Sequence, residues 1–83
     1  MSYEKVAQIK EGLVIGTKQT LKAMKSGEIS EVVIADDADQ QVTNKVSRLA
    51  NELKIPCVHV DSMKKLGKAC GIDVGTATVA IKH

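Results

Sequence analysis

The chain has 83 residues, of which 43% are hydrophobic and 27% are charged, and its formal net charge is +2. This composition is ordinary for one small globular domain over residues 1–83, and it excludes a disordered chain and a membrane-spanning protein. Tyr3 is the sole aromatic residue, which excludes domains that bind single-stranded nucleic acid by stacking bases on aromatic side chains.

The first residues predict a helix followed by a strand. Ser2 is placed to cap the helix and Gly12 to end it, with Val6 and Ile9 on the inner face. Residues 13–15 are a short apolar run that predicts a strand.

A second helix and strand follow in the same order. Thr17 is placed to cap this helix, which carries Leu21 and Met24 inward and ends at Gly27. Residues 32–35 form a continuous apolar run, which indicates a strand that is buried on both faces.

The third helix has the clearest periodicity in the chain. Asp39 is placed to cap it, and residues 55–60 predict the strand that follows. Because Pro56 cannot donate a hydrogen bond, we expect that strand to lie at an edge or to begin at Pro56. The apolar positions at helical spacing are Val42, Val46, Leu49, Ala50 and Leu53.

The last helix and strand complete the pattern. Ser62 is placed to cap the helix and Gly71 to end it, and residues 76–81 predict the final strand. The inward positions of this helix are Met63, Leu66 and Cys70. Four alternating helices and strands with short connections predict a three-layer α/β/α sandwich around a small four-stranded mixed sheet.

The start of the second helix carries a candidate nucleic-acid site. Lys18, Lys22 and Lys25 are spaced i, i+4 and i+7, so they form one basic stripe, and Gln19 lies in the exposed first turn. Lysine and glutamine side chains can read base edges. The alternative is a solvated helix face without function. The segment lacks the spacing of a phosphate-binding loop, which argues against nucleotide hydrolysis.

The segment from Gly71 to Thr76 places two apolar residues in a loop. Ile72 could anchor the end of the fourth helix while Val74 begins the last strand. Alternatively, both side chains form an apolar patch against an unstacked base. Three lysines upstream would then meet phosphates; they are Lys64, Lys65 and Lys68.

Two other clusters are weaker candidates. Asp36, Asp37 and Asp39 follow a predicted strand, where a metal-dependent hydrolase would hold its carboxylates, but no nucleophile or phosphate loop accompanies them. We interpret Asp39 as a helix cap and the others as solvated turn residues. Cys57, His59 and Cys70 have zinc-capable side chains, but their spacing fits no structural zinc pattern.

Together, residues 16–22 (GTKQTLK) and 66–74 (LGKACGIDV) resemble the kink-turn-binding ribosomal protein superfamily of the large-subunit seven-Ae and thirty-e type. The resemblance covers essentially the whole chain and is greatest to the small bacterial YbxF-type members. It implies an α/β/α sandwich that binds RNA kink-turns, in which tandem sheared G·A pairs follow a short bulge.

The resemblance also assigns roles to individual residues. Gly16 and Thr17 would approach the RNA backbone. Lys18, Gln19 and Lys22 would face the guanines of the G·A pairs. The loop that packs on the extruded nucleotide would consist of Ile72, Asp73 and Val74. Independently of the resemblance, we expect further lysines, Lys25 and Lys68 among them, to add salt-dependent affinity for RNA.

Three positions, in two segments, depart from archaeal members of that superfamily. Those members carry Asn-Glu where this chain has Lys18-Gln19, so the base contacts differ. They also tend to carry proline where this chain has Gly75, which we expect to make the loop more flexible.

The overall prediction is a cytoplasmic, monomeric RNA-binding protein, not an enzyme, with no cofactor, metal or small-molecule substrate and no membrane association. Ribosomal RNA and a riboswitch both remain possible targets. The alternative is a protein–protein adaptor that uses either the third-helix face around Gln40, Asn44 and Arg48 or the acidic turn.

Overall fold

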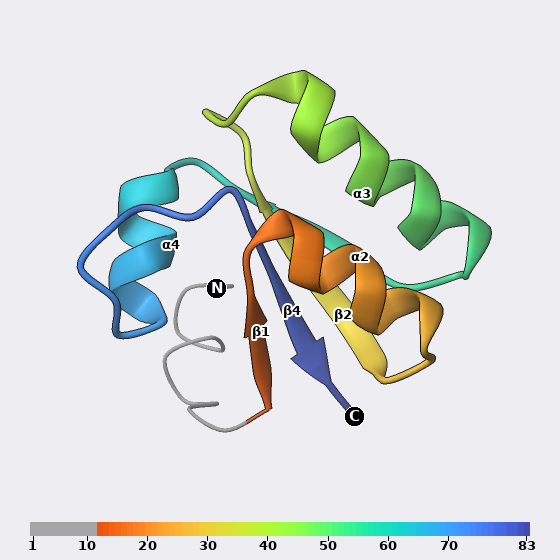
Figure 1. Cartoon of the computed structure of the whole chain (residues 1–83). Helices are drawn as coiled ribbons and strands as arrows, with labels where there is room; N and C mark the ends of the chain where they lie inside the picture. Colours follow the sequence, from red (N-terminus) through yellow and green to blue (C-terminus); the bar gives the residue numbers. More distant parts are fainter. Residues whose placement is uncertain (1–11) are drawn as a thin grey trace.

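The computed structural model describes residues 12–83, and the helix predicted from Ser2 lies outside these residues (Figure 1). The described elements, in chain order, are β1 (Leu13–Ile15), α2 (Thr17–Lys25), β2 (Ile29–Ala35), α3 (Gln40–Glu52), β3 (Cys57–Val60), α4 (Met63–Ala69) and β4 (Thr78–Lys82). Within this part of the chain, none of the helices is long and apolar enough to cross a membrane.

The four strands form one mixed sheet in the order β1-β4-β2-β3. β4 is antiparallel to both of its neighbours, whereas β2 and β3 are parallel. The predicted edge position of the strand after Pro56 is confirmed, because β3 is the outer strand. Pro56 still contributes its carbonyl, which accepts a hydrogen bond of 3.0 Å from the backbone N–H of Val32.

Helices cover both faces of the sheet, which confirms the predicted three-layer sandwich (Figure 1). On one face, α2 and α3 pack Met24 and Val46 against β2 residues such as Ile34. On the other face, α4 packs Leu66 against Val33. Alternate residues of β2 thus feed the two core layers, as expected for a strand buried on both faces.

Two of the three predicted helix caps in this part of the chain are confirmed. The Asp39 carboxylate accepts a hydrogen bond from the backbone N–H of Gln41, and the Ser62 hydroxyl accepts one from Lys65. The predicted Thr17 cap is wrong, because the N-cap of α2 is Gly16 and Thr17 is the first helical residue. The Thr17 hydroxyl instead points to β4, as described below.

The strand ends also differ from the prediction. β2 begins at Ile29 and not at residue 32, because Ile29 and Glu31 still pair with β4, and the Ser30 hydroxyl donates to the carbonyl of Ile81 at 3.1 Å. β3 and β4 begin two residues later than predicted. Leu53, predicted to point inward, is the C-cap of α3 and is 45% exposed.

Candidate nucleic-acid interface

The first turn of α2 is built on Gly16. This residue has a φ of +101°, a conformation that favours glycine, and it lets the chain turn directly from β1 into the helix. Thr20, one turn later, is completely buried, and its hydroxyl donates to the carbonyl of Val14 at 3.5 Å. With Thr20 turned inward, the neighbouring side chains of Lys18 and Gln19 are exposed to solvent.

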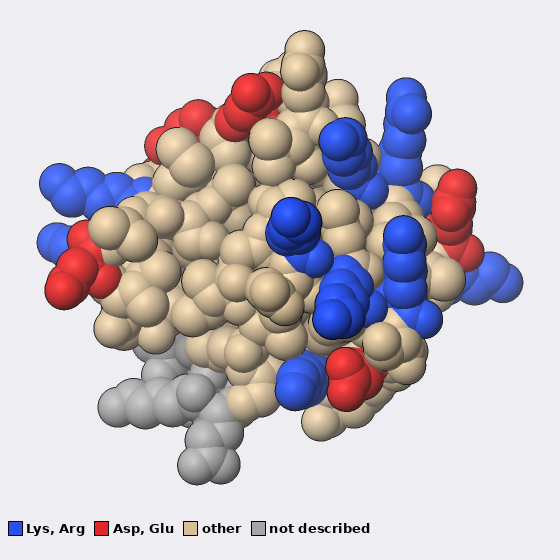
Figure 2. Space-filling model, in the orientation of Figure 1, with Lys and Arg blue, Asp and Glu red and all other residues tan. Residues whose placement is uncertain are grey.

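The basic stripe on α2 is exposed along its whole length. Lys18, Gln19, Lys22 and Lys25 are all solvent-exposed. Figure 2 shows lysine and arginine side chains gathered over α2 and α3, with acidic side chains toward the margin of this view. This exposure agrees with both interpretations of the stripe, a solvated helix face and a surface that binds a polyanion.

The stripe is divided between two hollows of the surface. Gln19 and Lys22 line a shallow groove of about 230 Å³ together with Lys82, a residue that the sequence analysis did not select. Lys25 lies on the rim of a different cavity of about 330 Å³ at the C-terminal end of α2. The structure therefore groups Gln19 with Lys22 and sets Lys25 apart.

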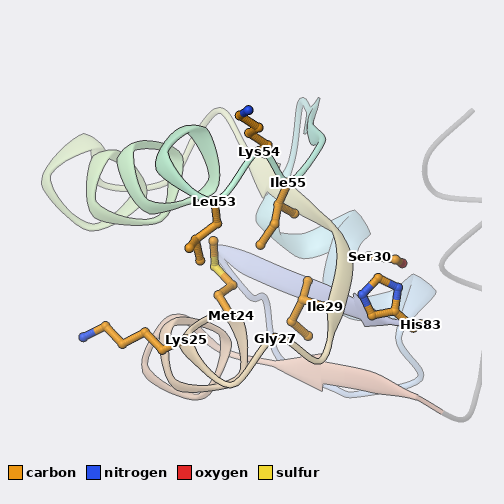
Figure 3. Close-up of a pocket in the computed structure, with 9 residues that line it drawn as sticks. All are labelled: Met24, Lys25, Gly27, Ile29, Ser30, Leu53, Lys54, Ile55 and His83. Carbon is orange, nitrogen blue, oxygen red and sulfur yellow. The ribbon is translucent and has the colours of Figure 1, made fainter.

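The cavity beside Lys25 has an apolar floor. Met24, Ile29, Leu53 and Ile55 line it from α2, β2 and the end of α3, and the Lys25 side chain extends away from it (Figure 3). Its position at the far end of α2 from Gly16 separates it from the groove that contains Gln19.

The loop after α4 is held against that helix by its backbone. The N–H of Ile72 donates to the carbonyl of Gly67 at 3.1 Å, and Ile72 is half-buried. Gly75 also packs closely, since a Cβ there would lie 3.2 Å from the carbonyl carbon of Met63. From the sequence, we expected Gly75 to make the loop more flexible. In the structure this glycine has a second role, because the absence of a side chain lets the loop backbone approach α4 closely.

Val74 is the most exposed large hydrophobic residue of the described chain, at 70%. The expectation that it begins the last strand is wrong, because β4 begins at Thr78. The two apolar loop residues therefore have different positions: Ile72 anchors the end of α4, and Val74 faces solvent. Asp73 between them is also exposed.

The start of α2 and the loop are joined through Thr78. Its carbonyl accepts the N–H of Gly16 at 3.0 Å, and its hydroxyl accepts from the Thr17 hydroxyl at 3.3 Å. From the loop side, the Thr76 hydroxyl donates to the same Thr78 carbonyl at 3.1 Å, and the Thr76 N–H donates to Met63 on α4. These bonds connect the start of α2 to the loop before β4 through one buried residue of β4.

Thr76 and Thr78 are not among the site residues predicted from the sequence. Both are buried, at 7% and 0% exposure. The sequence could have pointed to them through the two threonines at alternating positions beside an apolar strand. A buried hydroxyl requires a hydrogen-bond partner, so such a pair predicts a connection to another element.

The predicted lysines of α4 are exposed, but they differ in their surroundings. Lys65 forms a surface ion pair of 3.6 Å with Asp61, which partly neutralises it. Lys68 is in the last turn of α4, next to the loop that carries Asp73. Lys68 is therefore the better placed of these two cations for a ligand that covers the loop.

The acidic turn has structural roles. Asp37 accepts a hydrogen bond of 2.8 Å from the backbone N–H of Met63 and so helps to cap α4, while Asp39 caps α3. Asp36 contacts His59, with 2.8 Å between Oδ1 and Nδ1. The interpretation of Asp39 as a helix cap is confirmed. Asp36 and Asp37 are exposed turn residues, as expected, and each also contacts a side chain or a helix start outside the turn.

The three zinc-capable side chains are not all brought together: the Cys57 sulfur lies 4.0 Å from His59 Nε2, but Cys70 is on the opposite face of the sheet. Cys57 packs on the core face covered by α2 and α3, whereas Cys70 packs on the face covered by α4. Over residues 12–83, the structure has no group of three His, Cys, Asp or Glu side chains placed to hold a metal ion.

Comparison with known proteins adds the family context. Residues 1–83 match the family described as "Ribosomal protein L7Ae/L30e/S12e/Gadd45". The chain is 66% identical over 82 residues to a protein of Halalkalibacterium halodurans named as RNA-binding, covering 99% of both chains. It is 59% identical over 81 residues to the RNA-binding protein YbxF of Geobacillus stearothermophilus, covering 98% of both chains.

A solved structure has the same fold. The 15.5 kD RNA-binding protein of Giardia lamblia superposes with a TM-score of 0.87 at 27% sequence identity, covering 99% of this chain and 73% of that one. A protein of unknown function from Bacillus halodurans, at 23% identity and a TM-score of 0.85, has the same fold as well.

Proposed function

The chain belongs to the ribosomal protein L7Ae/L30e/S12e/Gadd45 family, and on this basis we propose that it is a non-enzymatic protein that binds RNA kink-turns. The names of its relatives support RNA as the ligand. The more specific part of the proposal, a kink-turn, rests on the residues of the interface described above. We further propose that the protein acts as a cytoplasmic monomer on ribosomal RNA or a riboswitch.

The observation that carries the proposal is the hydrogen-bonded connection, through the buried Thr78, between two elements with different exposed side chains. On one side, Lys18, Gln19 and Lys22 present donors and an amide acceptor at the start of a helix. On the other, the exposed Val74 presents an apolar side chain on a loop held against α4. A kink-turn offers the complementary pair, namely base edges at its G·A pairs and an extruded nucleotide at its bulge.

Each part of this surface has a chemical role in the proposal. Lys18 and Lys22 donate to guanine acceptors, and Gln19 donates and accepts at base edges. Gly16 and Thr17 let the helix start approach the RNA backbone, and Lys25 and Lys68 contribute to electrostatic affinity. Ile72, Asp73 and Val74 cover the extruded nucleotide, with Ile72 as the anchor on α4.

The mechanism is a shift of the RNA population. The bonds to Thr78 hold the two surfaces in one arrangement. In the proposal, this arrangement fits the bent RNA better than the extended RNA. A ligand that binds one of two conformations more tightly shifts the equilibrium toward it. The protein thereby stabilises the kinked RNA without catalysing a reaction.

The test is a fluorescence titration with a kink-turn duplex in moderate salt. The control duplex has the same length, with its G·A pairs changed to Watson–Crick pairs. We expect tight binding to the kink-turn alone, accompanied by increased energy transfer between dyes at the two RNA ends. Equal and weak binding to both duplexes would contradict kink-turn recognition and leave a nonspecific basic surface. The adaptor alternative would then become the leading hypothesis.

A further inference from the structure

A second cluster of reactive side chains lies at the β3 edge of the sheet. Cys57 and His59 alternate along β3 and therefore point to the same face. Their register neighbours on β2 are Val32 and Ile34, so Asp36, two residues beyond Ile34, reaches the same face. The cluster is separate from the proposed RNA interface, which is built from α2, α4 and the loop before β4.

The distances within the cluster place the His59 ring between the Asp36 carboxylate and the Cys57 thiol. His59 Nδ1 lies 2.8 Å from Asp36 Oδ1, and His59 Nε2 lies 4.0 Å from the Cys57 sulfur. A carboxylate only accepts hydrogen bonds, so it favours the tautomer in which Nδ1 carries the proton. The Nε2 lone pair then faces the thiol. A thiol, an imidazole and an orienting carboxylate in this order form an activated-nucleophile arrangement.

The thiol is also accessible from a cavity of suitable chemistry. Cys57 is half-buried and lines a hollow of about 380 Å³ together with Ser47, Arg48 and Asn51 of α3. Arg48 is exposed and can bind a carboxylate through its planar guanidinium. We propose that Cys57 is a thiol–disulfide exchange site for small disulfides that carry carboxylates, with His59 as proton acceptor and Arg48 as the carboxylate-binding group.

The exchange step is balanced without a further reactant. The Cys57 thiol transfers its proton to His59 Nε2, and the resulting thiolate attacks one sulfur of the small disulfide. A new S–S bond forms at Cys57, the original S–S bond breaks, and the leaving thiolate takes the proton from His59. The small disulfide is the oxidant, and it is reduced to one thiol as Cys57 becomes a mixed disulfide.

The electrostatic surroundings explain why a base is needed. Burial raises the pKa of the Cys57 thiol above its ordinary value of 9.0, and the nearby Asp36 carboxylate raises it further. The thiol is therefore protonated at neutral pH, and exchange requires a group that removes the proton during attack. The charged and titratable groups facing the sulfur are Asp36, His59 and, across the cavity, Arg48.

Cys70 provides an internal control. It is also half-buried, and burial alone raises its pKa. Among the described residues, no imidazole is hydrogen-bonded to it. The two cysteines thus differ mainly in the presence of the His59–Asp36 pair and the cavity with Arg48.

The first experiment needs no variant. The wild-type protein is incubated with oxidised glutathione at pH 7 and digested with trypsin, which places the cysteines in separate peptides, residues 55–64 and 69–82. Mass spectrometry then gives the rate of glutathionylation at each. We expect Cys57 to react about tenfold faster than Cys70, a modest share of what a positioned base contributes elsewhere. Equal rates, or a faster Cys70, would overturn the proposal.

Variants then assign the roles. His59→Gln and Asp36→Asn should each remove most of the rate difference, and dithiothreitol should release the adduct. Arg48→Gln should slow the reaction with oxidised glutathione but not with cystamine, which carries no carboxylate. A Cys57 rate that is unchanged in His59→Gln would contradict the role of the imidazole. In urea the two cysteines should react equally, because unfolding abolishes the arrangement.

Discussion

The backbone carbonyl of Val74 lies directly against Gly67 of α4, at a place where a Cβ on residue 67 would overlap it. Gly67→Ala therefore forces the loop away from the helix. At an unobstructed helical position this change stabilises a protein by up to about 1 kcal/mol. Here we expect the opposite sign, a loss of about 1–3 kcal/mol from overpacking, measured by urea denaturation. Binding to the kink-turn should weaken as well, because Val74 moves.

A Gly67→Ala variant that is more stable than the wild type would contradict this account of the loop. Lys45→Ala, an exposed position on α3, is the control. It should change both the stability and the binding only slightly, since surface substitutions are usually within about 0.5 kcal/mol.

The repeated helix–strand pattern could be predicted because each described helix and strand carries a local signal. Asp39 and Ser62 were recognisable as caps, and the apolar spacing of α3 was unambiguous. Thr17 was misassigned because a threonine before a helix has the same local pattern whether its hydroxyl caps the helix or, as here, bonds a distant strand. Residues 29–31 of β2 were missed because their pairing with β4 is a tertiary property, which the local pattern does not carry.

The candidate interface was predictable only in part for the same reason. The lysine stripe and the apolar loop are local patterns, and both are exposed as expected. Their connection through Thr78 depends on a contact between positions 61 residues apart. The division of the stripe, with Gln19 and Lys22 in one groove and Lys25 in another cavity, depends on which loops lie beside α2.

The double variant Gln19→Ala with Lys22→Ala tests the helix part of the interface. Both side chains are exposed, so the fold and the melting temperature should stay close to those of the wild type. Loss of two base-edge contacts should weaken kink-turn binding by at least about tenfold, because one good pairing contributes about 1–3 kcal/mol. Gln41→Ala with Lys45→Ala, exposed on α3, is the control. Equal titration curves for the two double variants would refute the site assignment.

Val74→Asp tests the loop part. Val74 is 70% exposed, so the aspartate should not unfold the chain, but it places a charge where an extruded nucleotide would pack. We expect weaker binding than for Lys64→Ala, which removes one exposed cation. Leu53→Asp makes the same kind of change at the other exposed large hydrophobic residue, on the cavity at the far end of α2. If Leu53→Asp and Val74→Asp weaken binding equally, the effect is one of net charge only.

Thr78→Val tests the connection between the two parts. Valine keeps the shape of the buried side chain and removes the hydroxyl that accepts from Thr17. The stability should fall by about 1 kcal/mol for the lost hydrogen bond. Kink-turn binding should fall as well, although Thr78 itself is buried. Thr43→Val removes another buried hydroxyl, which donates to the backbone carbonyl of Asp39, the N-cap of α3. This variant should lower the stability but leave kink-turn binding unchanged. If each variant loses kink-turn binding in proportion to its loss of stability, the role of Thr78 is structural only.

The two cysteines predict a pH dependence of stability. Burial raises the pKa of both thiols above their ordinary value of 9.0, and Asp36 adds to the increase at Cys57. The unfolded chain therefore loses these protons at a lower pH than the folded chain. Because the folded state then holds more protons, the free energy of unfolding decreases as pH rises through and above 9.0. Below that pH the contribution is complete.

Urea denaturation at a series of pH values between neutral and alkaline conditions measures this effect. The variant with Cys57→Ser and Cys70→Ser should lose less stability than the wild type over the alkaline part of the series, because serine does not ionise there. Other groups that titrate in this range are the same in both proteins, so the difference between the two curves isolates the thiols. In the single variants, Cys57→Ser should flatten the curve more than Cys70→Ser, since Asp36 acts on Cys57 alone. Parallel curves for the wild type and the double variant would show that neither thiol is protected from ionisation by the fold.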